Sequence, residues 1–190
     1  MVQQTNQSDV TEDVSDSITE SKPEIRQKIC ILGDFSVGKT SLVKRFVENR
    51  FDDKYLSTIG AKISRKKVET DRTAFDFYIW DLAGGEAFQH VTKSYISGAT
   101  GAVIACDLTR VETIKAMIVY TQLLQEMDPD IEIIFVGNKS DLIDERAISE
   151  SEISEISTLF GIPFYLTSAK TGENVNYLFS QMALNLAGKL

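Results

Sequence analysis

The chain has 190 residues, 43% hydrophobic and 25% charged, which suits one soluble domain with a full core. Its net charge of −8 argues against a nucleic-acid binder, because such proteins carry a basic surface. No apolar run approaches the roughly 20 residues that cross a bilayer, and the polar, acidic N-terminus does not have the pattern of a signal peptide. Cys30 and Cys106 lie in apolar runs, so we expect reduced core residues of a cytoplasmic protein.

Residues 1–25 are rich in Ser, Thr, Gln, Asp and Glu and contain few large apolar side chains. Such a segment buries too little apolar surface to offset its ordering entropy. We therefore expect a disordered acidic tail over residues 1–25, followed by a single folded domain over residues 26–190.

From residue 27 onward, short apolar runs alternate with amphipathic stretches. Runs rich in β-branched and aromatic residues are typical of buried strands, and they cover residues 28–33, 75–81, 101–107, 131–137 and 163–168. Strands that alternate with helices predict parallel pairing, with helices on both faces of the sheet. The run at residues 61–69 lies too close to the run at 75–81 for a crossover helix. These two should form an antiparallel hairpin at one edge of a six-stranded, mostly parallel sheet.

Two helix starts have the spacing of a capping box: Thr109 with Glu112, and Ser149 with Glu152. The helix after Ser149 should end at Gly161. It places four apolar residues on one face: Ile153, Ile156, Leu159 and Phe160.

The segment GDFSVGKT, residues 33–40, follows the first predicted strand and matches the pattern GxxxxGK[ST]. Its glycines let the backbone wrap around a phosphate, and the following helix adds its positive N-terminal end. An ordinary strand–helix turn is the alternative, which a motif of this length disfavours. Lys39 would bridge β- and γ-phosphates, while Thr40 would bind Mg²⁺. The nucleotide-binding residues expected here are Ser36, Val37, Gly38, Lys39, Thr40 and Ser41.

Two further segments at predicted strand ends indicate which base is bound. Residues 138–141, NKSD, follow the fifth strand, and there Asp141 can accept hydrogen bonds from N1–H and the exocyclic amine of guanine. Adenine offers no such pair, which makes an ATP-using enzyme improbable. Asn138 would tie the base loop to the phosphate loop, and the stem of Lys139 would cover the purine. Residues 168–170, Ser168, Ala169 and Lys170, would offer backbone amides to the guanine carbonyl. Either segment alone is compatible with an exposed turn.

A metal site and a switch are indicated by acidic and hydroxyl residues near the phosphate loop. Asp81 ends a strand, where it can hold Mg²⁺ through water, and the amide of Gly84 can touch the γ-phosphate. Thr58 lies in a loop-like stretch after the first helix. It would reach the metal only when a third phosphate draws that loop inward, which is the behaviour of a switch.

Together GDFSVGKT, STIG, WDLAG, NKSD and SAK resemble the Ras superfamily of small GTPases, and the Rab family most closely. The resemblance runs from about residue 25 to the C-terminus and implies the P-loop NTPase fold. It implies that Phe51 stacks on guanine and that Thr40 and Thr58 are ligands of Mg²⁺. Gly60, Trp80 and Tyr95 would lie on or near the surface that binds effectors. Ile63 stands where an aromatic is expected, so the identity of partners is not carried over.

Three departures from the family pattern concern hydrolysis and membrane attachment. Gly85 stands where the family usually has the glutamine that orients the attacking water. Phe35 occupies a phosphate-loop position that is usually small, near where a partner's arginine finger would enter. Gln89 and His90 are the candidates to reach inward in place of that glutamine, although solvated loop residues are the simpler interpretation. The sequence as given ends in LAGKL with no cysteine after Cys106, so Rab-type prenylation is not expected.

These patterns predict a molecular switch that binds GTP and GDP with Mg²⁺ and hydrolyses GTP slowly. The groups expected to act in hydrolysis are Lys39, Thr58 and Gly84. The alternative is a GTP-binding interaction module that scarcely hydrolyses and is controlled by exchange. We expect a monomer that meets an effector, an exchange factor and an activating protein through loops near Thr58 to Lys62 and Gly85 to Tyr95.

Overall fold

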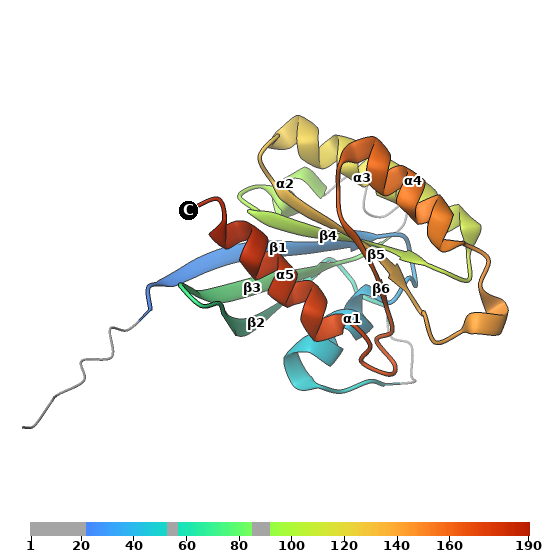
Figure 1. Ribbon diagram of the computed structural model, residues 1–190, viewed down its shortest axis with the longest axis horizontal. Coiled ribbons are helices and arrows are strands. Elements are labelled where there is room, and N and C mark those ends of the chain that lie inside the picture. The colour runs from blue at the N-terminus through green and yellow to red at the C-terminus, as the bar shows by residue number, and fades with distance from the viewer. Residues whose placement is uncertain (1–21, 53–56, 85–91) are drawn as a thin grey trace, which may run out of the picture.

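The computed structural model describes residues 22–52, 57–84 and 92–190, drawn in colour in Figure 1. Within them the strands are β1 (Glu24–Gly33), β2 (Ala61–Glu69), β3 (Ala74–Leu82), β4 (Gly101–Asp107), β5 (Glu132–Asn138) and β6 (Phe164–Thr167). The helices are α1 (Lys39–Glu48), α2 (Thr92–Ile96), α3 (Ile114–Met127), α4 (Glu150–Phe160) and α5 (Val175–Ala187), with short 3₁₀ turns at Val111–Thr113 and Ile143–Glu145.

The strands form one six-stranded sheet in the order β2-β3-β1-β4-β5-β6. β1 lies parallel to β3 and β4, and β5 lies parallel to β4 and β6. Only β2 runs antiparallel, paired with β3 as a hairpin. The predicted fold class is therefore confirmed: a mostly parallel sheet with one antiparallel edge strand. β1 also includes Glu24 and Ile25, which the sequence analysis assigned to the tail.

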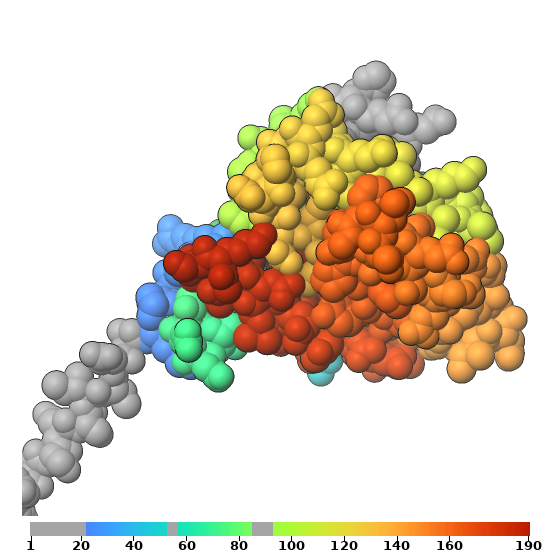
Figure 2. All heavy atoms as spheres, turned by 45° about the horizontal axis from the view of Figure 1, so that its top comes forward, coloured from blue at the N-terminus to red at the C-terminus, as the bar shows by residue number. Residues whose placement is uncertain are grey.

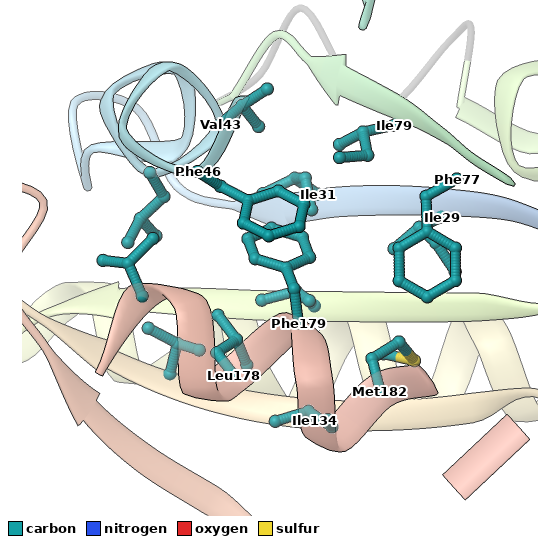
Figure 3. Packing of buried hydrophobic residues seen from close by; sticks show 14 of the residues in the cluster. Ile29, Ile31, Val43, Phe46, Phe77, Ile79, Ile134, Leu178, Phe179 and Met182 are labelled. Atoms are coloured by element: carbon teal, nitrogen blue, oxygen red, sulfur yellow. The ribbon is translucent and has the colours of Figure 1, made fainter. Parts of the chain in front are cut away.

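Alternate residues along the strands fill two separate cores, one on each face of the sheet. On one face, α1 and α5 pack against Ile29, Ile31, Phe77 and Ile79, as Figure 3 shows. On the other face, residues from α2, α3 and α4 cover Cys30, Leu32 and the remaining β4 and β5 side chains. The parallel strands therefore direct their carboxyl ends to one edge, between the two helical layers, where ligands of such sheets bind.

Helix starts give one confirmation and one correction. Ser149 forms the predicted capping box, because its hydroxyl accepts from the amide of Glu152 and its own amide donates to that carboxylate at 2.8 Å. The box predicted for Thr109 and Glu112 is wrong. Thr109 instead donates its hydroxyl to the buried carboxylate of Asp107 at 2.7 Å, so it cannot cap a helix, and α3 begins later.

Two other expectations concern apolar residues. Of the apolar face predicted for α4, Ile153 is fully buried, but Leu159 is 72% exposed and does not join it in the core. Cys30 and Cys106 are buried free thiols, as predicted, and burial raises the pKa of each to about 12. Among the described residues, no helix combines the length and apolarity needed to cross a bilayer.

Candidate functional site

A cavity of about 350 Å³ opens at the carboxyl edge of the sheet, where the loops after β1, β3, β5 and β6 converge. Thirteen of the predicted site residues line it: Ser36, Gly38, Lys39, Thr40, Ser41, Phe51, Thr58, Gly84, Asn138, Lys139, Asp141, Ala169 and Lys170. Val37, Asp81 and Ser168 are buried behind its wall. Five other residues also line the cavity: Phe35, Lys44, Asp52, Leu82 and Leu142.

The phosphate-loop backbone is held in conformations that few residue types accept. Gly38 has a φ of +96°, and a Cβ there would collide with the side-chain amide of Asn138, so only glycine fits. Ser36 also has a positive φ of +61°, which costs a non-glycine residue on the order of 1 kcal/mol. Local strain of this kind is typical of loops whose backbone is shaped for a ligand.

Lys39 lies at the floor of the cavity with only 6% of its surface exposed. Its ammonium donates to the carbonyls of Gly33, at 3.0 Å, and Asp34, at 2.8 Å, and so spans the phosphate loop. Burial lowers the pKa of Lys39 to about 8, against the opposing effect of Asp81 and Asp34. Phosphate oxygens would stabilise this buried ammonium, because they can accept charge-assisted hydrogen bonds from it.

The backbone of Gly84 lies close to the ammonium of Lys39. A Cβ on Gly84 would lie 2.5 Å from the Lys39 ammonium and 2.6 Å from the carbonyl of Asp34. The absence of a side chain therefore lets the backbone after β3 approach the phosphate loop closely, within reach of whatever Lys39 binds.

Asn138 joins the two loops that the sequence analysis assigned to base and phosphate. Its side-chain amide donates to the carbonyl of Val37 at 2.9 Å, and its side-chain oxygen accepts from the amide of Ala169 and the hydroxyl of Thr167. Asn138 is 2% exposed, so these bonds replace water that the side chain cannot reach.

Asp141 is fixed at the other end of the cavity. Ser168 donates its hydroxyl to one carboxylate oxygen of Asp141 at 2.6 Å, which orients the carboxylate. Ser140 is anchored in the same way, through a 2.6 Å hydrogen bond to Glu173. The arrangement leaves Asp141 lining the cavity as an acceptor held in place by the loop after β6.

Three oxygen-bearing side chains meet beside Lys39. Thr40 donates to one oxygen of Asp81 at 2.6 Å, and the hydroxyl of Thr58 lies 2.8 Å from that of Thr40. The other oxygen, Oδ1 of Asp81, is buried without a hydrogen-bond partner among the described residues, and burial raises the pKa of the carboxyl. One carboxylate and two hydroxyls fit Mg²⁺, which binds few protein oxygens and keeps positions for water and phosphate.

A buried ionic cluster next to the base loop escaped the sequence analysis. Asp107, at the end of β4, accepts from Lys139 at 2.6 Å and from Arg110 at 2.9 Å, and Arg110 also donates to the carbonyl of Phe35 at 2.6 Å. Burial would raise the pKa of Asp107, but these hydrogen bonds and those from Thr109 outweigh it and hold the pKa below its usual value. The only signal in the sequence was an acidic residue at the end of an apolar run.

Some predicted residues lie outside the described ranges. Gly85, Gln89 and His90 belong to residues 85–91, which lie outside the described residues. Gly60 and Tyr95 are described and lie close together, because a Cβ on Gly60 would be 3.7 Å from the Tyr95 hydroxyl. The rings of Tyr95 and Trp80 are 6.3 Å apart.

A phosphate loop at the end of β1, a buried lysine and an acidic base loop at the end of β5 define a P-loop nucleotide-binding protein. The family model "Ras family" matches residues 28–187. Over 157 residues the chain is 39% identical to Ras-related protein Rab-22A of Canis lupus familiaris, covering 82% of this chain and 81% of that protein. It is 37% identical over 166 residues to Ras-related protein Rab-24 of Dictyostelium discoideum, covering 86% and 82% respectively.

The chain therefore belongs to the Ras family of small GTPases and is Rab-like. Membership makes it a GTP-binding molecular switch at the level that the whole family shares. Small GTPases of this family bind GTP, GDP and Mg²⁺, and Rab-type members interact with effectors and exchange factors.

Proposed function

We propose that this protein is a guanine-nucleotide switch whose own GTP hydrolysis is slow, so that partners or nucleotide exchange set its state. The observation that carries the proposal is the contact between Thr58 and Thr40, 2.8 Å apart beside Asp81. Through it, the loop after α1 reaches the position where Mg²⁺ and a terminal phosphate would lie, so the order of this loop can depend on that phosphate.

In the proposed complex, the base occupies the end of the cavity near Asp141 and Lys139, and Phe51 stacks on it from the loop after α1. The carboxylate of Asp141, oriented by Ser168, accepts from guanine. The amides of Ala169 and Lys170 face the base carbonyl. Asn138 adds no contact with the base in this account, since its hydrogen bonds hold the two loops at a fixed separation.

At the phosphate end, the amides of residues 36–41 surround the β-phosphate and Lys39 spans the β- and γ-phosphates. Thr40 and Thr58 would bind the metal directly, and Asp81 would hold it through water. When bound, Mg²⁺ neutralises charge that develops on the phosphate oxygens during transfer. The chain contributes Lys39, the Gly84 amide and the phosphate-loop amides as fixed positive groups, aimed at the same oxygens.

We expect slow hydrolysis because the chain lacks the usual side chain that orients the attacking water. Gly85 stands at the usual glutamine position, and a glycine carries no side chain to orient a water. Phe35 adds a second obstacle, since its ring lines the cavity where a partner's arginine would approach. Even Ras, with its glutamine, hydrolyses GTP at only about 10⁻⁴ per second unaided. Gln89 or His90 is the substitute to test if hydrolysis proves faster.

A second candidate function is a GTP-binding interaction module that hydrolyses little or nothing and is reset by exchange. Phe35 and Gly85 favour it, whereas the contact of Thr58 with Thr40 favours retained sensing of the terminal phosphate. The nucleotide that co-purifies with the protein separates the two, because a module would retain mostly GTP and a hydrolase mostly GDP.

The deciding experiment is single-turnover hydrolysis of GTP-loaded protein with Mg²⁺, comparing the natural chain with Gly85→Gln. We expect the natural chain to turn over at or below about 10⁻⁴ per second and the variant to be about tenfold faster. Gly188→Gln is the matched control, since Gly188 has ordinary φ near the C-terminus and lies far from the cavity. Brisk hydrolysis by the natural chain, about 10⁻² per second or faster, would contradict the proposal.

We further propose that effectors and exchange factors bind at residues 58–62 and 85–95, on a cytoplasmic monomer. Trp80 and Tyr95 supply aromatic surface there, and Ile63 is 51% exposed on the neighbouring strand. We keep residues 26–190 as the proposed GTPase domain, with the strand residues Glu24 and Ile25 added, and residues 1–23 as the segment before it.

A further inference from the structure

The solvent-facing side of the β1–β3–β2 edge carries a group of cationic residues in an otherwise acidic protein. We call this group the basic strip: Arg26, Lys28, Arg65 and Lys67. Strand register brings the four together, because Lys28 aligns with Tyr78 of β3 and Tyr78 aligns with Arg65. In the same way, Asp76 of β3 lies between Arg26 and Lys67.

This side of the sheet edge is open to solvent. Arg26, Arg65 and Lys67 are all exposed, whereas the alternating residues of the same strands, such as Phe77, are buried in the core. The helices that make most of the described contacts with β2 and β3 are α1 and α5, and they lie on that core side.

The acidic residues within the strip neutralise only part of its charge. Arg65 binds both oxygens of the buried Asp76, at 2.7 and 2.9 Å, and Lys67 pairs with Glu24 at 2.9 Å. Four cations against three carboxylates on the same face, those of Asp76, Glu24 and the exposed Glu69 in the register row of Glu24, leave an excess of one positive charge. The strip continues into aromatic surface, because the ammonium of Lys28 lies 4.1 Å from the centre of the Trp80 ring.

The segment that precedes β1 has the opposite charge. Residues 1–21 contain no lysine or arginine and five acidic residues, a net charge of −5: Asp9, Glu12, Asp13, Asp16 and Glu20. Its attachment point is fixed, since Lys22 donates to the carbonyl of Thr70 at 2.8 Å and Pro23 accepts from the amide of Ala74 at 3.0 Å. The start of β1 and the β2–β3 turn lie together at the surface beside α5 (Figure 2).

We propose that the acidic segment of residues 1–21 docks on the basic strip of its own chain. The attachment point lies at the end of the strip that holds Arg26 and Lys67, and Glu24 already makes the first acid–base pair there. From Arg26 to the register position of Trp80 is four strand residues, about 13 Å, well within reach of 21 residues of chain. Covalent linkage gives the segment an effective concentration in the millimolar range, so individually weak, exposed ion pairs can suffice.

Docking has a consequence for partners, and this consequence rests on the proposed switch function. Trp80 borders Tyr95, and Ile63 pairs with Trp80 across the hairpin, so the docked segment would cover one side of the proposed effector surface. The docking itself requires no nucleotide hydrolysis and can be tested apart from it.

The test is paramagnetic broadening in the full chain, with a nitroxide at Ser15→Cys. The label goes to residue 15 alone, because Cys30 and Cys106 are buried and their thiol pKa values are raised to about 12. We expect the amide signals of the basic strip and the indole signal of Trp80 to lose about half their intensity at low salt. They should recover near 0.5 M salt, where the screening length falls to about 4 Å.

Two variants of the labelled chain give the control. The first neutralises the segment and should abolish broadening: Asp9→Asn, Glu12→Gln, Asp13→Asn, Asp16→Asn and Glu20→Gln. The second removes the same charge from exposed positions outside the β1–β3–β2 edge and should leave broadening intact: Glu126→Gln, Asp144→Asn, Glu145→Gln, Glu150→Gln and Glu155→Gln.

The proposal would be overturned if the broadening were uniform or affected residues outside the basic strip. It would also be overturned if the broadening did not change with salt or with the charge of the segment. If broadening is absent and the full chain sediments with phosphatidylserine vesicles, the strip is a lipid-binding surface instead, and the proposal is equally wrong. If broadening occurs while GTP hydrolysis is brisk, docking stands and the proposed slow switch fails.

Discussion

The side-chain amide of Asn138 donates to the backbone carbonyl of Val37 at 2.9 Å, joining two loops that are 101 positions apart in the sequence. The same side chain occupies the space that a Cβ on Gly38 would need. This buried carboxamide therefore helps to set the distance between the loops after β1 and β5, together with the Asp107 cluster that connects Lys139 to Phe35 through Arg110.

Replacing Asn138 by Ala should weaken nucleotide binding more than it alters the fold. Loss of a buried hydrogen bond costs on the order of 1–3 kcal/mol, equivalent to about a 5- to 150-fold increase in Kd. The rate of GDP release, followed with a fluorescent analogue, measures this. Asn185→Ala is the matched control, because Asn185 makes one hydrogen bond to Glu132 far from the cavity. Unchanged GDP release in Asn138→Ala would show that the loops hold their separation without it.

Asp141→Asn should change which base is preferred. An amide presents one acceptor and one donor in place of two acceptors, so it matches the 2-carbonyl of xanthine better than the 2-amine of guanine. We expect GTP affinity to fall at least about 100-fold while xanthosine triphosphate gains. Competition binding with both nucleotides measures the switch, and the exposed Asp144→Asn serves as the control. Equal losses for both nucleotides would instead indicate a folding defect.

The pair of Arg65 and Asp76 predicts a pH-dependent part of stability. Hydrogen bonding from Arg65, against the effect of burial, holds the pKa of Asp76 below its usual value. The unfolded chain has the ordinary pKa of about 3.9, so the pair's contribution is present above that pH and is lost as pH falls through the lower folded value. Arg65→Ala should therefore lower Tm at pH 7, and the difference from the natural chain should shrink below about pH 4.

Thermal unfolding followed by circular dichroism between pH 7 and pH 3 tests this. Lys67→Ala provides the comparison, because Lys67 forms its ion pair with Glu24, whose side chain is 45% exposed, and lowers the pKa of Asp76 less than Arg65 does. A Tm difference for Arg65→Ala that stays constant with pH would remove Asp76 from the explanation.

The stacked rings of Phe46 and Phe179 should dominate the α1–α5 contact. Their centroids are 3.9 Å apart, with an interplanar angle of 13°, and Phe179 is fully buried (Figure 3). Phe179→Ala should destabilise by about 3–5 kcal/mol, because the cavity it leaves cannot collapse fully. Urea unfolding of GDP-bound protein measures the free energy. The exposed Leu184→Ala on the same helix should stay within about 0.5 kcal/mol of the natural chain. Similar losses for the two variants would contradict this packing account.

Residues that act through local chain geometry were predictable from the sequence. The alternation of apolar runs predicted the sheet, and the five residues between 69 and 75 left no room for a crossover, which set β2 antiparallel to β3. The phosphate loop and the segment NKSD were found because a glycine pattern or an acid at a strand end has the same meaning wherever it occurs. The carboxyl ends of parallel strands share one edge, so these loops had to meet.

Other features depended on which distant residues the fold brought together. In the sequence, Asp107 is simply an acidic residue at the end of a strand. The structure shows that Lys139 and Arg110 both donate hydrogen bonds to its carboxylate. The same carboxylate accepts a hydrogen bond from the hydroxyl of Thr109, so the helix cap expected at Thr109 does not form. Leu159 shares the predicted helix with the fully buried Ile153, but the fold leaves its side chain 72% exposed.

The sequence by itself determined the class of fold, the order of its strands along the chain and the loops that line the cavity. These follow from short-range periodicity and from motifs whose chemistry is complete within about eight residues. The sequence analysis assigned Thr58, Thr40 and Asp81 to one metal site, but only the tertiary structure decided that their side chains hydrogen-bond to one another. It alone also decided that Gly84 lies against Lys39, and that four cations gather on one open sheet face. Each of these is a contact between elements, set by strand order and register, and no local pattern encodes which partners a side chain will meet.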